Sequence, residues 1–135
     1  MIERIFDGDK EIAVIIRNDF DKKGIEFVTD DAYSQQVAYM HHETGHTIIP
    51  HFHNLVERTV QYTQEVLVIK EGKLQVDFYH DNMDYYKSTI LEAGDIILLC
   101  AGGHGFEVIE EVKMVEIKQG PYMGEADKTR FERRN

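Results

Sequence analysis

The chain is a succession of short apolar segments separated by turn signals, and this pattern restricts it to folds made of many strands. Segment 73–79 shows the pattern most clearly, because Leu74, Val76 and Phe78 alternate with polar residues and so share one face of a strand. The strands predicted in this way cover residues 11–17, 24–29, 36–42, 65–70, 73–79, 88–92, 95–100, 106–110 and 112–118. The pattern predicts an all-β fold, an antiparallel sandwich or barrel, of which the jelly roll is one form.

Two local features are expected within this fold. Residues 66–78 have the pattern of a hairpin that turns at Glu71 and Gly72. Helix signals are weak and confined to 30–36 and to the tail. We expect the tail to fold back over the barrel or a partner subunit, because Phe131 would otherwise be exposed among charged residues.

The composition is that of one globular domain. At 135 residues the chain can bury a core but is too short for two ordinary domains, so residues 1–135 are interpreted as a single domain. The formal net charge of −10 argues against nucleic acid and anionic membranes as partners. The apolar run at 11–18 is too short for a signal peptide or a membrane span. With a single cysteine, Cys100, no intrachain disulfide is possible, so we expect a cytoplasmic protein in which Cys100 is a buried small hydrophobe.

Two histidines, His51 and His53, lie one residue apart directly after Pro50. If this stretch is a strand, both imidazoles point to one face while Phe52 points to the other. The pair would then offer two nitrogen ligands to one metal ion. The alternative is a pair of half-exposed polar residues on the solvated face of a sheet.

The stretch from 45 to 72 resembles the first sequence motif of the cupins. In that motif a glycine, five residues and His-x-His lead to a glutamate with six residues before a further glycine. The matching positions are Gly45, His51, His53, Glu65 and Gly72.

The stretch from 94 to 105 resembles the second cupin motif, in which a glycine opens a strand and a histidine closes it. The matching positions are Gly94, Gly102 and His104. More narrowly, the chain is similar to small single-domain cupins encoded among polysaccharide-biosynthesis genes. The resemblance implies the cupin double-stranded β-helix, a jelly-roll barrel.

Two departures from the cupin pattern bear on the ligand set. Eleven residues separate His53 from Glu65, where the family usually has three or four. Glu57 has the usual distance from His53 and is therefore the alternative to Glu65, although Gln64 stands where a glycine should follow. We favour Glu65, with 54–64 as a longer loop at the mouth of the barrel. In the second motif Cys100 replaces a proline.

The resemblance implies that His51, His53, Glu65 and His104 bind one metal ion. Three neutral imidazoles and one carboxylate suit a divalent transition metal, which would be Fe, Mn, Ni, Co, Cu or Zn. One or two coordination positions could remain open for a substrate oxygen or water.

Three further residues are candidates for contact with a substrate. Arg58 lies in the long loop, where its guanidinium could grip a carboxylate, phosphate or hydroxyl; an ordinary salt bridge to Glu57 is the alternative. Gln61 is a candidate substrate contact, and Glu107 a candidate general acid or base if it faces the cavity. We expect His41, His42 and His46 to be solvated or hydrogen-bonded rather than ligands, and His80 to be a surface loop residue.

The function expected from the resemblance is metal-dependent chemistry on a small polar or sugar-type molecule, either isomerisation or epimerisation, or oxygenation if the metal is iron. One alternative is a metal-free epimerase or ketoisomerase with a histidine base, and another is a ligand-binding or sensor protein without catalysis. We also expect a homodimer, because the terminal strands leave sheet edges that pairing across a two-fold axis would cover.

Overall fold

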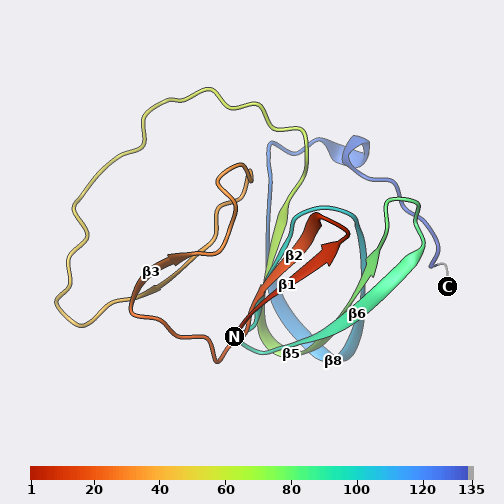
Figure 1. The fold of residues 1–135 in the computed structure, drawn as a ribbon, viewed down its shortest axis with the longest axis horizontal. Helices are drawn as coiled ribbons and strands as arrows, with labels where there is room; N and C mark the ends of the chain where they lie inside the picture. The colour runs from red at the N-terminus through yellow and green to blue at the C-terminus, as the bar shows by residue number, and fades with distance from the viewer. Residues whose placement is uncertain (134–135) are drawn as a thin grey trace.

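The computed structural model describes residues 1–133, and their regular secondary structure is almost entirely β-strand (Figure 1). The strands are β1 (Ile2–Asp7), β2 (Lys10–Ile16), β3 (Gly24–Phe27), β4 (Ala38–His41), β5 (Glu65–Tyr79), β6 (Tyr85–Glu92), β7 (Ile96–Leu99) and β8 (Gly103–Lys118). A single 3-10 turn, η1 (Gly124–Asp127), follows them. The predicted all-β class is confirmed.

Six strands form one curled antiparallel sheet, which makes a half-barrel (Figure 1). Their order is β1-β2-β7-β5-β6, and β8 also pairs with β5. The first part of β5, residues 65–68, pairs with β7, whereas its second part, residues 73–79, pairs with β6. Strand β8 follows β5 along both parts. The two parts of β5 therefore belong to different walls of the half-barrel.

The expected hairpin at Glu71 and Gly72 is wrong, because β5 continues through these residues. Gly72 has φ of +88°, and the pairing of β5 with β8 shifts register between Ile69 and Leu74. A glycine in this conformation with a shifted register forms a bulge, which bends a strand without ending it. Both parts of β5 bond to the same partner strand, so the chain cannot reverse direction here. The bulge helps to curl the sheet.

Two buried clusters lie on the two faces of the sheet. The larger cluster is inside the curl, and its largest members are Phe78, Ile12, Ile15, Ile69, Leu74, Leu91 and Ile97. The smaller cluster is on the outer face, where Val14, Val66 and Leu98 pack beneath Phe20 and Tyr33. The alternation in 73–79 explains the first cluster, since Leu74, Val76 and Phe78 are at most 1% exposed.

Residues 42–64 form no strand, so the expected strand through His51 and His53 is wrong. Pro50 cannot donate to a ladder, and the segment lies away from the sheet (Figure 1). We call residues 44–56 the arm. The arm follows the small two-stranded sheet of β3 and β4, and it is exposed throughout. The loop expected at 54–64 is therefore longer and includes both histidines.

The tail folds back onto the half-barrel, as the sequence predicts. The Phe131 ring packs edge-on against Tyr79, with ring centroids 5.1 Å apart. Asp127 accepts a hydrogen bond from the Thr63 hydroxyl. Within residues 1–133 no helix has the length and apolar character that a membrane span requires.

Candidate functional site

Glu65 and His104 meet although neither pairs with the other along the sheet. Glu65 begins β5 and lies opposite Lys118, whereas His104 lies near the start of β8, opposite Phe78. The curl of the β5–β8 ladder brings the two ends together, so that His104 Nε2 is 3.3 Å from Glu65 Oε1. Their side chains are only 25% and 12% exposed. One residue from each motif-like stretch thus contributes to a half-buried contact.

The charge of Glu65 is stabilised by its neighbours. Hydrogen bonding to His104 lowers the pKa of Glu65 to about 2, and a hydrogen bond from Glu116 adds to this while burial opposes it. The hydrogen bond with Glu65 also raises the pKa of Glu116 above its ordinary value, and burial acts in the same direction. Of the two carboxyl groups, Glu65 is therefore the one that ionises at the lower pH.

Sequence reasoning missed Glu116. It lies on β8 opposite Leu67, one of the residues inside the curl, and so shares the inner face. Its alternation with Met114 and Lys118 in the predicted strand 112–118 was the only available signal. That alternation indicates which face of the strand Glu116 occupies, but it does not show that Glu65 is the residue it contacts inside the curled sheet.

The lowered pKa of Glu65 predicts a contribution to stability that depends on pH. A depressed folded-state pKa stabilises the protein above the ordinary value of 4.5, and this stabilisation is lost as pH falls from 4.5 to about 2. In metal-free protein with chelator, His104→Ala should raise the midpoint pH of acid unfolding by about half a unit or more, measured by circular dichroism. His53→Ala, on the exposed arm, should leave the midpoint unchanged. Equal midpoints for wild type and His104→Ala would contradict the assignment.

His51 and His53 are close to each other but are not brought to Glu65 and His104. Their rings are 5.4 Å apart at an angle of 78°. His51 Nδ1 is 2.8 Å from the carbonyl oxygen of Ile49, so it donates there and leaves Nε2 with a lone pair for a metal. Across residues 1–133, no three His, Cys, Asp or Glu side chains are grouped closely enough to hold an ion.

Arg58 and Gln61 line one shallow groove, together with the end of β8 and the tail. The groove has a volume of about 560 Å³, and Pro121, Tyr122 and Met123 lie on its other side. The Arg58 guanidinium lies 3.5 Å from the carbonyl oxygen of Val56, an exposed contact within its own loop. Both candidates are thus near one another and accessible to a small molecule.

Glu57 and Glu107 lie apart from the Glu65–His104 contact. Glu57 is an exposed residue just beyond the arm. Glu107 pairs with Gln75, whose neighbours on β5 point into the curl, so Glu107 lies on the outer face of the ladder. His104 lies opposite Phe78 on the inner face. Glu107 and His104 therefore face opposite sides of β8.

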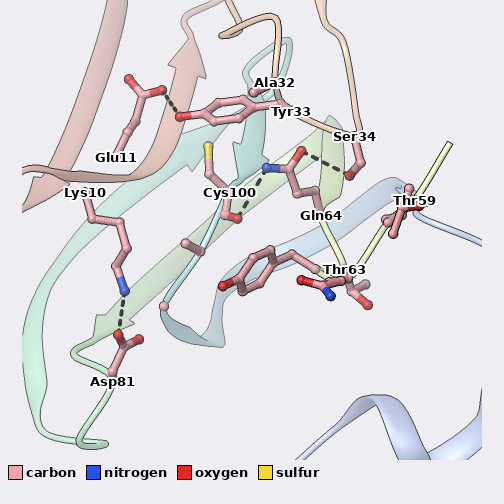
Figure 2. A pocket seen from close by; sticks show the side chains of 15 residues that line it. Lys10, Glu11, Ala32, Tyr33, Ser34, Thr59, Thr63, Gln64, Asp81 and Cys100 are labelled. Carbon is pink, nitrogen blue, oxygen red and sulfur yellow. Dashed lines mark hydrogen bonds and ion pairs between the residues drawn. The ribbon is translucent and has the colours of Figure 1, made fainter.

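A second pocket, which Gln61 also lines, lies between the start of β2, residues 100–102 after β7, and residues 32–34 and 59–64 (Figure 2). Apart from Gln61, sequence reasoning did not identify it. Its volume is about 840 Å³. The Tyr33 hydroxyl donates to Glu11 at 2.6 Å, and Gln64, only 5% exposed, bonds to the Cys100 carbonyl oxygen at 3.4 Å. The Cys100 side chain is buried, and burial raises the pKa of its thiol to about 12. Cys100 is thus the inert buried residue that the sequence predicts.

The remaining histidines are occupied elsewhere. His41 Nδ1 is 2.6 Å from Asp21, and His80 Nδ1 is 2.7 Å from Asp7. The rings of His42 and His46 stack with centroids 4.1 Å apart. The prediction of a solvated or hydrogen-bonded ring is confirmed for His41, and His80 lies in the loop after β5 as expected. It is wrong for His42, because its Nε2 is buried and has no hydrogen-bond partner within residues 1–133.

When the chain is compared with known proteins, no family model, curated protein or solved structure matches it.

Proposed function

We propose that the protein is a single-domain cupin that binds one divalent transition metal and acts on a small polar, sugar-type molecule. The observation that supports this most is the contact of Glu65 with His104 inside the curled sheet. These are the residues that the two cupin-like motifs assign to the metal. They lie 39 positions apart in the chain, and local sequence patterns alone would not bring them together.

The proposed site is completed when an arm covers the open side of a half-barrel. The donors would then be His51, His53, Glu65 and His104, a set of three imidazoles and one carboxylate that fits Fe, Mn, Ni, Co, Cu or Zn. The His51 hydrogen bond to a backbone carbonyl and the low pKa of Glu65 both prepare these groups as ligands. When bound, the ion would act as a Lewis acid on a substrate carbonyl or hydroxyl, or support oxygen chemistry if it is iron.

The chain's own residues supply the other functions of such a site. Glu116 retains its proton to a higher pH than an ordinary glutamate, so it can donate a proton or hydrogen bond close to Glu65. Arg58 and Gln61 line the groove beside the tail and offer donors to a hydroxyl, carboxylate or phosphate group. The raised pKa of Glu116 suits proton transfer during isomerisation or epimerisation, so we place this reaction class ahead of oxygenation.

One observation favours a second candidate function, metal-free epimerisation or ketoisomerisation with a histidine base. His104 and Glu65 form a half-buried imidazole–carboxylate pair, in which the carboxylate orients the ring. Full turnover of a sugar-type substrate in chelator-treated protein would favour this candidate over the metal enzyme.

Metal content tests the proposal. Untagged protein purified without chelator is expected to contain close to one transition-metal ion per chain by mass spectrometry. His53→Ala and His104→Ala should each reduce this content at least about tenfold, since a lost ligand costs more than the lost outer-shell partner of a ligand. His80→Ala, which removes a histidine bonded to Asp7, should leave it unchanged. A metal-free wild type after reconstitution with Fe(II), Mn, Ni and Zn would refute metal binding.

A further inference from the structure

Strand β8 has one unpaired edge, and apolar side chains on both of its faces are exposed. Within residues 1–133 it pairs only with β5, so the backbone groups along its other edge have no strand beside them. Phe106 and Val108 lie opposite Val76 and Leu74 on the inner face, yet they are 41% and 56% exposed. Val115 on the outer face is 46% exposed. A long apolar edge strand of this kind is normally covered.

The arm has the properties of the missing cover. Its side chains Ile49, Phe52 and Leu55 are 83%, 85% and 105% exposed, which is unusual for large apolar residues in one short segment. Beyond the turn at 44–45, its backbone lies in no helix or strand. A segment that takes up an extended conformation can add as a strand to an open edge, with backbone hydrogen bonds giving affinity and alternate side chains filling the apolar surface.

Hydrogen bonds hold the segments before and after the arm, and the arm itself lies away from its own β8 (Figure 1). At one end, β4 is held through the bond of His41 to Asp21. At the other end, buried Gln64 accepts a hydrogen bond from the Gln35 amide at 3.1 Å and contacts Cys100. The exposed apolar arm and the exposed apolar strand therefore lie on different sides of one molecule, which is the arrangement of an element that is exchanged between copies.

Charge also favours a second copy as the occupant. The arm contains no Asp, Glu, Lys or Arg, although the chain as a whole carries −10. It can therefore approach another copy without the like-charge repulsion that most of the surface would produce. Its histidines would meet β8, whose acidic residues are Glu107, Glu110, Glu111 and Glu116.

We propose that the arm of one chain docks along β8 of a second copy, and that the exchange is reciprocal across a two-fold axis. This inference rests on the proposed metal site. In the exchanged dimer, His51 and His53 of each chain lie beside Glu65 and His104 of the other. Each site is thus built from two chains. An arm that closes on its own β8, with a site made within one chain, is the outcome that would overturn the proposal.

Complementation between two inactive variants distinguishes these arrangements. One chain carries His51→Ala with His53→Ala, the other Glu65→Gln with His104→Ala, and each has a different affinity tag. Neither homodimer should hold metal. The heterodimer, purified through both tags, should hold about one ion per two chains, because intact arm and intact body then meet at one of its two sites. A metal-free heterodimer beside a metal-loaded wild type would show that the site forms within one chain.

A cross-link tests the exchange without reference to metal. In a Cys100→Ala background, one tagged chain carries Phe52→Cys and the other Phe106→Cys. Oxidation should join them as a covalent heterodimer, whereas Phe52→Cys with Phe6→Cys, on the opposite edge strand β1, should remain largely unlinked. Cross-linking without metal in the wild type would uphold the exchange and reject the metal site. Equal linking in both pairs, or none in either, would reject the exchange.

Discussion

Gly72→Ala is expected to lower the free energy of unfolding by more than about 3 kcal/mol, enough to leave much of the protein unfolded at 37 °C. Gly72 has φ of +88°, a conformation that side chains rarely adopt. A Cβ placed there would lie 2.0 Å from the Glu111 carbonyl oxygen and 2.7 Å from its carbon. Backbone of the central β5–β8 ladder cannot move aside as a flexible side chain can.

Gly8→Ala is the matched control for this substitution. Gly8 also has a positive φ, +62°, but a Cβ there would meet no atom within 4 Å. Its replacement should therefore cost only about 1 kcal/mol, the backbone strain alone. Urea unfolding of the two variants separates strain from collision. Similar losses for both would mean that β8 does not approach Gly72 as closely as the structure shows.

Asp95→Ala is expected to cost about 2–4 kcal/mol, because it leaves two backbone amides without their buried acceptor, while Arg17 keeps its ion pair with Glu3. Asp95 is 4% exposed. Its carboxylate accepts hydrogen bonds from the amides of Asn18 and Glu92, both at 2.8 Å, and from the Arg17 guanidinium at 3.0 Å. The contact with Arg17 joins the end of β2 to the turn before β7. The effect should appear as a lower urea midpoint with an unchanged slope.

An exposed aspartate in an ion pair provides the comparison for Asp95. Asp81 bonds to Lys10 at 2.6 Å, but its side chain is 76% exposed. Asp81→Ala should change stability by less than about 0.5 kcal/mol, since solvent screens such pairs. Should Asp95→Ala prove as mild as Asp81→Ala, the Asp95 carboxylate would have no structural role of the kind described.

The strands of the half-barrel could be predicted from the sequence because their signals are local. Alternation in 73–79 and the apolar run in 95–100 identify β5 and β7 without any knowledge of the partners. The turn expected at Glu71 and Gly72 failed for the converse reason. A glycine after a charged residue is typical of a turn, but the bulge depends on β8, which lies more than thirty residues further along the chain.

The candidate site could be predicted in part, because the motif spacing that identifies two of its residues is a local signal in the sequence. Motif spacing selected Glu65 and His104, and the curl brings them together. Motif spacing could not give the position of His51 and His53, because the arm pairs with no strand of the described sheet that would fix its conformation. Glu116 and the Tyr33–Glu11 bond arise from contacts between distant segments and carry no local signal.

Strand β5 belongs to both walls of the half-barrel, and this determines which parts of the sheet unfold first. Among the strands of residues 1–133, edge strand β1 is bonded only to β2, and β6 only to β5, so either can fray without disturbing the rest of the sheet. Strand β5 bonds to three neighbours and contributes to two walls, so exposing its amides requires nearly the whole sheet to come apart. Its amides should therefore be the last to exchange with solvent, and β5 sets the size of the cooperative unit. Glu65, at the start of this strand, is thus fixed to the least mobile part of the chain, while the two histidines proposed to join it belong to the most exposed.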